Sequence, residues 1–515
     1  MKYFSTRGAP DIRSFEDVVL AGLAPDGGLY IPDHIPPLPS DWQSEWSHLS
    51  YQDLAVEILS LFIPSEELSP VDLKALVYKT YDFPQKFRRE IITPLVELDS
   101  RTYVLELFHG PTYAFKDLAL QLVGNLFEFF LSRRNSRKSP GEKAEKLTVV
   151  GATSGDTGSA AIYGLRNKAN ISIFILFPKG RVSPIQEAQM TTVSDTNVHN
   201  LAVKGTFDDC QDILKNLLAD KEFNAKHNLG AVNSINWARI LAQIVYYFSA
   251  FFQLQRILPA NEDSEIQFVV PTGNFGDILA GYYAKRLGLP MGKLGVATNA
   301  NDILTRFWKT GRYEKFDSMS NAGTEDVQAT LSPAMDIAVS SNFERLLWYL
   351  AYEASFETED SARRTAACSK LNGWMTEVKQ RGKVDLQDVL PAAQRDFVAE
   401  RVDDGQTLEA IREQFNAPTP YVSDPHTAVG LYAAKALAAT NPPSVVQVVL
   451  STAHPAKFSA AVTRALASSP VFNFERDVLP LEFHDLLTRE RRVEEVEKPD
   501  VELVKAVIEK FTEVR

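Results

Sequence analysis

A chain of 515 residues is too long to fold around one hydrophobic core, so its length predicts two or three domains. Its 45% hydrophobic and 23% charged content is ordinary for a globular protein that folds in water. Acidic residues outnumber basic ones by 66 to 54, and the net charge of -12 argues against nucleic acid as a partner. The two cysteines, Cys210 and Cys368, are too few for a disulfide framework or a multi-cysteine metal site, so we expect no metal centre and a reducing compartment.

No segment of the chain predicts insertion into a membrane. Residues 1–8 carry charge without an apolar run behind them, so a secretory signal is not expected. The most apolar stretch, residues 240–258, is interrupted by Gln243, Gln253 and Arg256, which predicts a helix buried inside a large domain. We therefore expect a cytoplasmic protein with no membrane partner.

The chain changes character near residue 100. Residues 1–98 are rich in proline and aromatic side chains and predict an N-terminal domain. An apolar run, a loop rich in Gly, Ser and Thr, and an amphipathic helix then follow one another repeatedly along residues 99–480. This rhythm is typical of a doubly wound, largely parallel α/β sheet. The apolar runs that carry it are residues 147–150, 266–270 and 445–450.

The C-terminal segment, residues 481–515, mixes charged residues with widely spaced apolar ones. From residue 493 onward, Val501, Val504, Ile508 and Phe511 recur at helical spacing. This pattern predicts one amphipathic helix that packs against the body of the protein.

Lys116 is a candidate for covalent chemistry. A Gly-Pro pair breaks regular structure within residues 109–117 (HGPTYAFKD), and an apolar helical pattern begins directly after the lysine. A helix N-terminus disfavours an ammonium, and the apolar neighbours Ala114 and Phe115 disfavour it further through desolvation. The sequence therefore predicts a lowered pKa, which Schiff-base chemistry requires because only the neutral amine attacks an aldehyde. Taken alone, however, this residue favours a solvated surface lysine, because most lysines are solvated, and only its context raises the catalytic interpretation.

Two glycine-rich loops each lie between an apolar run and a helical pattern, an arrangement that presents backbone N–H groups to an anion. Residues 272–277 (TGNFGD) suit a phosphate, and the hydroxyl groups within residues 151–158 (GATSGDTG) suit a carboxylate or a phosphate. Two such loops in one chain predict ligands with two anionic groups, although either loop alone could be only a tight turn. Neither loop has the spacing of a Walker A or a dinucleotide-binding motif.

Together these features resemble the fold type II (tryptophan synthase β-like) enzymes that use pyridoxal 5'-phosphate, and more narrowly the threonine synthase family. The long N-terminal region is similar to that of the longer, yeast-like class. The motifs that carry the resemblance span most of the chain in the family's order, namely residues 4–8 (FSTRG), 26–30 (DGGLY), 109–117, 151–158, 233–239 (NSINWAR) and 424–428 (DPHTA).

The resemblance implies an α/β fold with two doubly wound subdomains and the active site between them, preceded by the N-terminal domain. Lys116 would form a Schiff base with pyridoxal 5'-phosphate, and the hydroxyl of Thr452 would lie at the pyridine nitrogen. The cofactor phosphate would be held by the backbone of Gly273, Asn274, Phe275 and Gly276, with Asp277 nearby. The substrate carboxylate would be surrounded by Ser154, Gly155, Asp156 and Thr157. The substrate phosphate would be bound by Asn236 and Arg239, in a helix expected to open at Ser234.

Several nearby residues also have a purely structural interpretation. Asp424 and Pro425 have the types expected of an N-cap and the first helical position, and Ser234 could likewise be only a cap. We expect His109 and His454 to be hydrogen-bonded structural histidines, and Phe275 to pack beneath its loop. The two cysteines are expected to be buried and inert.

The implied reaction converts O-phospho-L-homoserine and water to L-threonine and phosphate, in a monomer or a homodimer. The alternatives are a lyase that acts on the same substrate to give 2-oxobutyrate, a serine or threonine dehydratase, and a non-catalytic scaffold of the same fold. The intact lysine and glycine loops argue against the scaffold, and residues 233–239 argue against the dehydratase.

Overall fold

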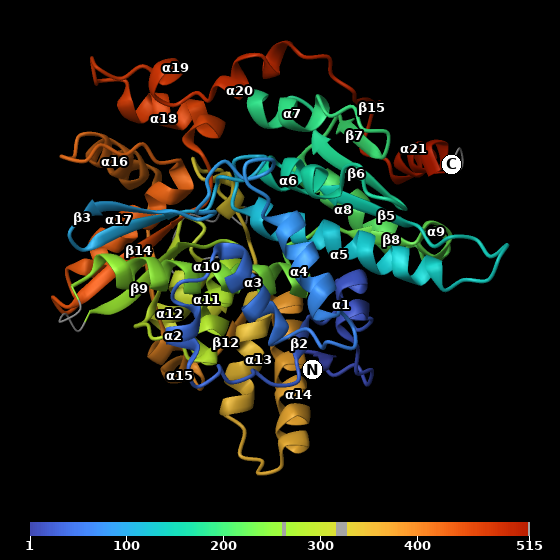
Figure 1. Cartoon of the computed structure of the whole chain (residues 1–515), viewed down its shortest axis with the longest axis horizontal. Helices are drawn as coiled ribbons and strands as arrows, with labels where there is room; N and C mark the ends of the chain where they lie inside the picture. Colours follow the sequence, from blue (N-terminus) through green and yellow to red (C-terminus); the bar gives the residue numbers. More distant parts are fainter. Residues whose placement is uncertain (260–263, 316–326, 513–515) are drawn as a thin grey trace.

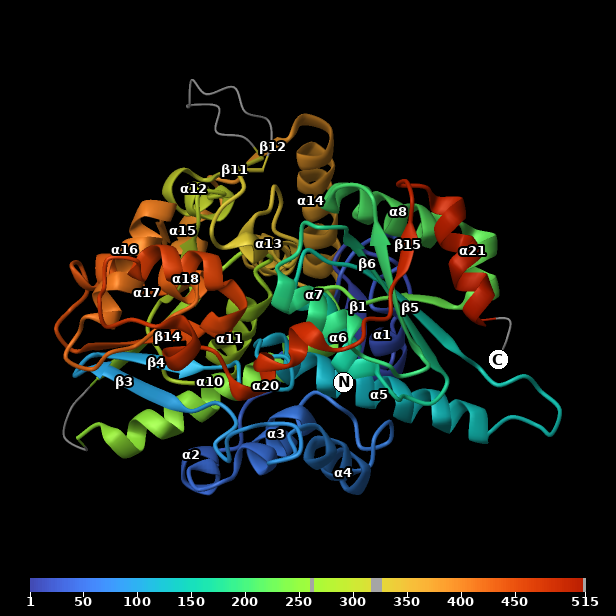
Figure 2. The same cartoon turned by 90° about the horizontal axis from the view of Figure 1, so that it is seen from above.

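The structure is a computed structural model that describes residues 1–259, 264–315 and 327–512. It contains two parallel β-sheets flanked by helices, with N-terminal helices packed below them (Figures 1 and 2). The larger sheet has six strands in the order β13-β10-β9-β14-β4-β3, all parallel except the edge strand β3. Its strands are β3 (Leu95–Asp99), β4 (Thr102–Glu106), β9 (Glu265–Pro271), β10 (Leu294–Thr298), β13 (Phe397–Arg401) and β14 (Val445–Ser451).

The smaller sheet has five parallel strands in the order β15-β7-β6-β5-β8. Parallel sheets are buried on both faces, which explains why β5, β6, β9 and β14 read as nearly continuous apolar runs. The predicted fold, two doubly wound α/β subdomains, is confirmed. The strands of this sheet are β5 (Leu147–Ala152), β6 (Ile171–Pro178), β7 (Val198–Val203), β8 (Leu229–Ala231) and β15 (Glu494–Val496).

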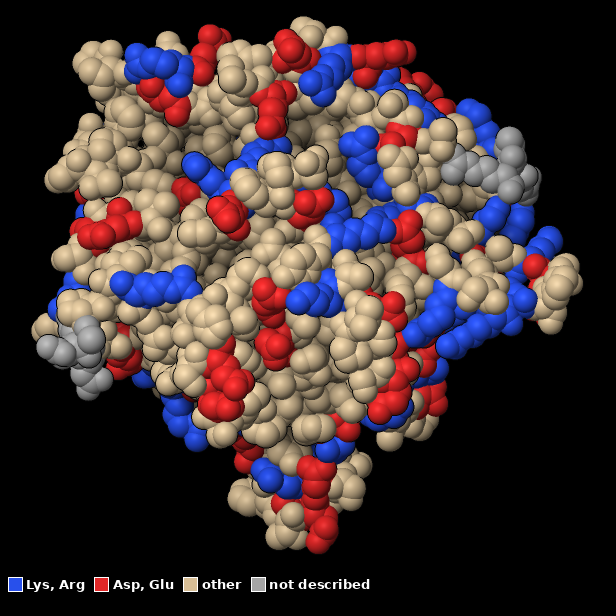
Figure 3. All heavy atoms as spheres, in the orientation of Figure 1, with Lys and Arg blue, Asp and Glu red and all other residues tan. Residues whose placement is uncertain are grey.

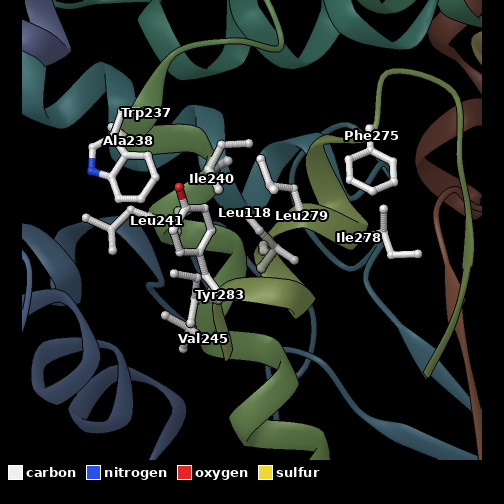
Figure 4. Packing of buried hydrophobic residues seen from close by; sticks show 14 of the residues in the cluster. Leu118, Trp237, Ala238, Ile240, Leu241, Val245, Phe275, Ile278, Leu279 and Tyr283 are labelled. Atoms are coloured by element: carbon white, nitrogen blue, oxygen red, sulfur yellow. The ribbon is translucent and has the colours of Figure 1, made fainter. Parts of the chain in front are cut away.

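Two long helices connect the sheets along the chain and carry residues toward the site. Helix α5 (Lys116–Ser136) leads from the larger sheet to the smaller one, and α10 (Trp237–Ile257) leads back. The expected buried helix at residues 240–258 is α10, which is buried along most of its length. Figure 4 shows Leu118 of α5, Val245 of α10 and Leu279 of α11 (Gly276–Leu287) within one cluster of apolar side chains. Among the described residues, no helix is long and apolar enough to cross a membrane.

The N-terminal region packs against α10 and α5 and shares their hydrophobic core. Tyr3 contacts Trp237 of α10 with ring centroids 5.9 Å apart, and its hydroxyl donates to the Phe62 carbonyl. The predicted domain boundary at residue 98 falls inside β3, a strand of the larger sheet. The elements of this region are β1 (Tyr3–Ser5), α1 (Phe15–Ala21), β2 (Tyr30–Pro32), α2 (Trp42–Trp46), α3 (Tyr51–Ser60) and α4 (Pro70–Thr80).

The C-terminal segment belongs to the smaller subdomain. It adds β15 to the edge of that sheet, and the expected amphipathic helix forms as α21 (Val501–Thr512), with Val504 and Ile508 buried against α8. The last three residues of the predicted segment, 513–515, lie outside the described part of the chain.

The remaining elements complete the two layers around the sheets, and positive and negative side chains alternate over the face shown in Figure 3. They are α6 (Asp156–Leu165), α7 (Pro184–Thr191), α8 (Phe207–Ala219), α9 (Lys221–His227), α12 (Ile303–Thr310), β11 (Arg312–Glu314), α13 (Phe343–Glu353), α14 (Asp360–Arg381), β12 (Lys383–Asp385), α15 (Leu390–Asp396), α16 (Asp404–Phe415), α17 (Pro425–Ala438), α18 (Ser459–Leu466), α19 (Phe474–Asp477) and α20 (Leu481–His484).

Helices α5 and α6 cross closely at two glycines. A Cβ atom on Gly124 would lie 1.9 Å from the carbonyl oxygen of Gly164, and one on Gly164 would lie 2.5 Å from the carbonyl oxygen of Leu120. Because the neighbouring atoms belong to the backbone, a side chain fits at either position only if the two helices move apart.

We expect Gly124→Ala to lower the free energy of unfolding by about 1–3 kcal/mol, the usual cost of overpacking. Gly373 of α14 is the matched control, because nothing lies within 4 Å of a Cβ added there. Gly373→Ala should leave stability unchanged or raise it by up to about 1 kcal/mol, since alanine favours a helix. Urea denaturation of the two variants would contradict the close crossing if both were equally stable.

Candidate active site

The candidate site lies at the carboxyl edge of the larger sheet. Strands β9, β14 and β4 are neighbours and run parallel, so the loops that follow them emerge side by side. These loops carry residues 272–277, Thr452 and Lys116, three of the features predicted from the sequence. Ligands of open α/β sheets bind at this edge.

Lys116 is held in register with Thr452 by backbone pairing. Ala114 forms an antiparallel bridge with Ala453, and the amide of Phe115 donates to the carbonyl of Thr452 at 2.8 Å. The amide of His454 donates in return to the carbonyl of Tyr113 at 3.1 Å. Lys116 is the first residue of α5, where the sequence predicts it.

The turn before Lys116 closes around a buried carboxylate. Asp117 accepts hydrogen bonds from the amide and the hydroxyl of Thr112, both at 2.7 Å. A Cβ atom on Gly110 would lie 2.5 Å from the Cβ of Asp117, so this close approach requires glycine. Burial raises the pKa of Asp117 to about 6.

The amine of Lys116 is available for reaction. Its side chain is partly exposed, and its Nζ lies 5.5 Å from the centre of the Phe115 ring. The amine forms no hydrogen bond with a described residue. Burial lowers that pKa to about 8, while the nearby carboxylate of Asp156 acts in the opposite direction. A substantial fraction of the amine is therefore neutral near physiological pH, as Schiff-base formation requires.

The loop after β9 turns its backbone N–H groups toward the site. The carbonyl of Gly273 accepts from the Ser340 hydroxyl at 2.7 Å, and the carbonyl of Asn274 accepts from the amide of Asn342 at 3.0 Å. Because the N–H and C=O of a trans peptide point in opposite directions, the amides of Asn274 and Phe275 face away from residues 340–342. Together with the free N–H groups at the start of α11, they form an anion cradle.

Two side chains of this loop point into the protein. Phe275 adopts a left-handed backbone conformation (φ 62°), and its ring packs against Trp308 and Phe343, as expected for a core residue. The carboxylate of Asp277 accepts from the hydroxyls of Tyr246 at 2.6 Å and Tyr247 at 2.9 Å. Asp277 therefore anchors α11 to α10.

The loop after β5, which belongs to the smaller sheet, supplies a second anion cradle. The hydroxyl of Thr153 closes the loop by accepting from the amides of Gly155 at 3.0 Å and Gly158 at 2.9 Å. The side chains of Ser154 and Thr157 are partly exposed at the start of α6. Their hydroxyls and the first amides of α6 can bind a carboxylate.

The side chain of Asp156 is already engaged within this loop. Its Oδ1 lies 2.7 Å from the Nζ of Lys457 and accepts a hydrogen bond from Gln186 at 2.8 Å. A Cβ on Gly155 would lie 2.7 Å from the Gln186 amide, so glycine is required for this contact. Burial raises the pKa of the Asp156 carboxyl, but the ammonium groups of Lys457 and Lys116 outweigh burial and hold that pKa well below its usual range.

Arg239 is a buried cation with unused hydrogen-bonding capacity. The residue is 4% exposed and its guanidinium donates from Nη1 to the carbonyl of Asn233 at 2.7 Å, whereas its buried Nε has no hydrogen-bond partner among the described residues. Burial lowers its pKa to about 10. Arg239 also lies close enough to Lys116 to lower the pKa of that amine, which places it at the site.

Asn236, the other predicted ligand of the substrate phosphate, has a structural role. It is the N-cap of α10, where its Oδ1 accepts from the amide of Ala238 at 3.0 Å and its Nδ2 donates to the carbonyl of Val19 at 2.8 Å. The helix therefore opens at Trp237, two residues later than a cap at Ser234 would place it. An asparagine in the N-cap position explains the difference, because its side chain satisfies the first free amides.

Thr452 offers a buried hydroxyl that has no hydrogen-bond partner in the described part of the chain. Its backbone amide is held by the hydroxyl of Thr427 at 3.2 Å, and the Thr427 hydroxyl in turn donates to Asp424, the N-cap of α17. The expected cap at Asp424 and Pro425 is therefore present and also positions Thr452. An unpaired buried hydroxyl beside a free amine and a phosphate-sized cradle fits a phosphorylated pyridine aldehyde.

The two histidines of the site make structural contacts. The Nε2 of His109 lies 2.7 Å from a carboxylate oxygen of Glu106. Burial lowers the pKa of His454 to about 3, and the Nδ1 of this neutral ring accepts from the amide of Ala456 at 3.2 Å. Burial also raises the pKa values of Cys210 and Cys368, which keeps both thiols protonated.

We did not predict Lys457 or Gln186 from the sequence. Nor did we predict the two hydrogen bonds through which Thr427 connects Asp424 to the amide of Thr452. Lys457 lies five residues after Thr452 in the same loop, and a lysine so close to a predicted site was a signal that could have been followed. Gln186 lies in α7 and carried no comparable signal.

Comparisons with known proteins cover nearly the whole chain. The family model "Threonine synthase N terminus" matches residues 2–81, "Pyridoxal-phosphate dependent enzyme" matches residues 87–377, and "Threonine synthase, C-terminal" matches residues 427–508. Threonine synthase of Schizosaccharomyces pombe is 54% identical over 99% of this chain and 98% of its own. The crystal structure of yeast threonine synthase superposes with a TM-score of 0.92 at 52% identity, covering 100% of this chain and 99% of that one. A threonine synthase of Brucella melitensis with bound pyridoxal phosphate is 40% identical and superposes with a TM-score of 0.85, covering 99% of each chain.

A free amine at the edge of a two-sheet α/β fold, with a glycine loop for a phosphate, defines a pyridoxal-phosphate-dependent enzyme of fold type II. Identity to threonine synthases along almost the full length narrows the assignment further. The chain belongs to the threonine synthase family.

Proposed function

We propose that the chain converts O-phospho-L-homoserine and water to L-threonine and phosphate. The observation that carries the proposal is the amine of Lys116, placed near two buried polar groups that lack hydrogen-bond partners, the Thr452 hydroxyl and the Nε of Arg239. The first suits the cofactor ring, and the second suits a phosphate that is distinct from the cofactor phosphate.

The cofactor would be held by three features of the larger subdomain. Lys116 binds its aldehyde, the N–H groups of residues 273–276 bind its phosphate, and the hydroxyl of Thr452 hydrogen-bonds the pyridine nitrogen. A hydroxyl at that nitrogen does not force it to be protonated, as a carboxylate would. When bound, the cofactor supplies a sink for the electrons of the substrate's carbon–hydrogen bonds.

The substrate would bridge the two subdomains. Ser154, Thr157 and the first amides of α6 hold the α-carboxylate, and Arg239 binds the phosphate as a charge-assisted hydrogen-bond donor. Asn236 would add at most one contact to the phosphate, through the second N–H of its Nδ2, because the first N–H donates to the Val19 carbonyl and the Oδ1 caps α10. A substrate held at both ends presents its carbon chain to Lys116.

Lys116 would move the protons. Its neutral amine would take one proton from Cα and one from Cβ of the substrate, so that phosphate can leave from Cγ. Water would then supply a hydroxyl group to Cβ, and Lys116 would return one proton to Cγ and one to Cα. The remaining proton of the water balances the phosphate released. Exclusion of other water from the site is necessary, because a proton delivered to the wrong carbon diverts the substrate to a keto acid.

Product analysis tests the proposed reaction. The purified holoenzyme is incubated with O-phospho-L-homoserine, and phosphate, L-threonine, 2-oxobutyrate and ammonia are quantified. Equal amounts of phosphate and threonine support the proposal. Equal amounts of phosphate, 2-oxobutyrate and ammonia would identify a lyase instead, activity on free threonine would indicate a dehydratase, and no turnover would favour a scaffold.

We expect Thr452→Val to weaken cofactor binding without lowering the stability of the apoprotein. Valine has nearly the same shape and removes a buried hydroxyl that has no partner, so the apoprotein should be as stable as the wild type or slightly more stable. Affinity for pyridoxal 5'-phosphate should fall by about threefold to tenfold, the value of one hydrogen bond. Visible-absorbance titration of the apoprotein measures this loss, and unchanged affinity would remove Thr452 from the cofactor site.

We also propose that the enzyme works in the cytosol, where its two buried thiols remain reduced.

A further inference from the structure

The loop proposed to bind the substrate carboxylate carries a carboxylate of its own. Asp156 is the first residue of α6, next to the hydroxyls of Ser154 and Thr157 and close enough to Lys116 to affect its pKa. Two like charges in a buried site repel each other strongly, because little water separates them. An uncompensated Asp156 would therefore oppose binding of an α-carboxylate.

Lys457 compensates this charge from the other subdomain. Its Nζ lies 2.7 Å from Oδ1 of Asp156, and the side chains of the two residues are 0% and 5% exposed. Lys116 is the other cation that lowers the pKa of Asp156, but its amine is committed to the cofactor when the enzyme is loaded. In the holoenzyme the Asp156 carboxylate therefore depends on Lys457.

Lys457 is also fixed to the turn that carries Lys116. Its Nζ donates to the carbonyl of Thr112 at 2.7 Å, and the amide and hydroxyl of Thr112 bind Asp117. Lys457 thus has a defined position, set by a backbone carbonyl of the larger subdomain. From there it reaches a carboxylate of the smaller one.

We infer that Lys457 is a positioning residue for the substrate carboxylate. It neutralises Asp156 and orients it away from the ligand, so that the amides and hydroxyls of residues 154–157 can bind an anion. The inference rests on the proposed function, because it takes an α-amino acid with a free carboxylate as the ligand. It predicts that the contribution of Lys457 to binding depends on the charge of that carboxylate.

The test compares two probes that differ only in this charge. One is the phosphonate analogue of O-phospho-L-homoserine, whose carbon–phosphorus bond does not permit loss of phosphate, and the other is the same compound with a carboxamide in place of the α-carboxylate. Calorimetry on the holoenzyme gives the dissociation constants for the wild type, Lys457→Met, Asp156→Asn and the double variant. KM and kcat for O-phospho-L-homoserine are measured in parallel.

We expect Lys457→Met to weaken binding of the carboxylate probe by about tenfold or more, and of the carboxamide probe by less than about threefold. The double variant, which removes both charges, should restore most of the affinity for the carboxylate probe. The double variant also serves as the test protein if Lys457→Met does not fold, because it leaves no unpaired charge buried in the protein.

Two results would overturn the inference. Equal weakening for both probes would show that Lys457 only supports the fold, and unchanged binding of the carboxylate probe would show that Asp156 needs no compensation. Failure of the proposed function itself is separate, because the wild-type enzyme would then either bind neither probe or turn over O-phospho-L-homoserine to products other than L-threonine and phosphate.

Discussion

Replacing Lys116 with alanine should lower kcat by at least about 10³-fold while leaving the fold intact. A positioned proton-transfer group alone contributes about 10²–10⁴-fold, and this variant also loses the covalent link to the cofactor. The side chain is partly exposed and its amine forms no hydrogen bond with a described residue, so its truncation removes little packing and breaks no hydrogen bond of the described structure. Turnover with O-phospho-L-homoserine and circular dichroism measure the two effects.

Lys86 provides the matched control. Burial lowers its pKa to about 8, as for Lys116, but its Nζ donates to the carbonyl of Lys79 outside the site. Lys86→Ala should therefore retain activity, which separates a lowered pKa from a catalytic role. Borohydride reduction of the wild-type holoenzyme should attach the cofactor to Lys116, and label on another residue would refute the assignment.

The same pKa sets the pH dependence of cofactor capture. Only the neutral amine of Lys116 reacts with an aldehyde, and its fraction rises as the pH increases toward and past about 8. The rate at which the apoprotein is reconstituted should therefore rise between pH 6 and about 8 and level off above pH 9, well below the ordinary lysine value. A rate that kept rising toward pH 10.5, the ordinary pKa of lysine, would show that Lys116 is not desolvated.

Features set by neighbouring residues in the chain could be predicted from the sequence. Strands β5, β9 and β14, the start of α5 at Lys116 and the cap at Asp424 follow from local patterns of apolar residues, glycines and capping side chains. The anion cradles follow in the same way, because a glycine loop between a strand and a helix determines where its own amides point.

Features set by distant partners could not be predicted. Asp277 stands beside the phosphate loop in sequence, yet its carboxylate points to the two tyrosines of α10. Asp156 pairs with Lys457, which is about 300 residues away along the chain, and a local motif contains no information about such a partner. The orientation of a charged side chain is decided by whichever buried group compensates it, and this requires the tertiary structure.

We expect Arg239→Met to reduce kcat/KM for O-phospho-L-homoserine by about 10²–10³-fold without destabilising the apoprotein. Loss of a desolvated, charge-assisted partner costs about 2–5 kcal/mol of binding. The stability of the apoprotein should change little, because the loss of one hydrogen bond to the Asn233 carbonyl is offset by the removal of a cation whose pKa burial lowers to about 10. A cation with a lowered pKa in the folded state destabilises that state at every pH at which it is charged, so its removal carries no electrostatic penalty.

Arg345 is the matched control for this experiment. It is fully buried and has a pKa lowered to about 10, like Arg239, but all three of its nitrogens donate hydrogen bonds, to the carbonyls of Tyr30 and Ile235 and to Asn342. Arg345→Met leaves these buried acceptors without donors and should lower the free energy of unfolding by about 3 kcal/mol or more. The two arginines therefore predict opposite outcomes, with lost activity at Arg239 and lost stability at Arg345.

Inorganic phosphate can report on Arg239 without any turnover. A ligand that binds only the folded protein raises its melting temperature, so phosphate should stabilise the wild-type holoenzyme. In the holoenzyme the cofactor phosphate would already fill the proposed cradle at residues 273–276, so free phosphate would reach only the proposed substrate site. Arg239→Met should abolish this stabilisation, whereas Arg345→Met should retain it from a lower starting temperature. Equal stabilisation of the wild type and Arg239→Met would mean that another group binds the substrate phosphate, and the unpaired Nε of Arg239 would then need a different explanation.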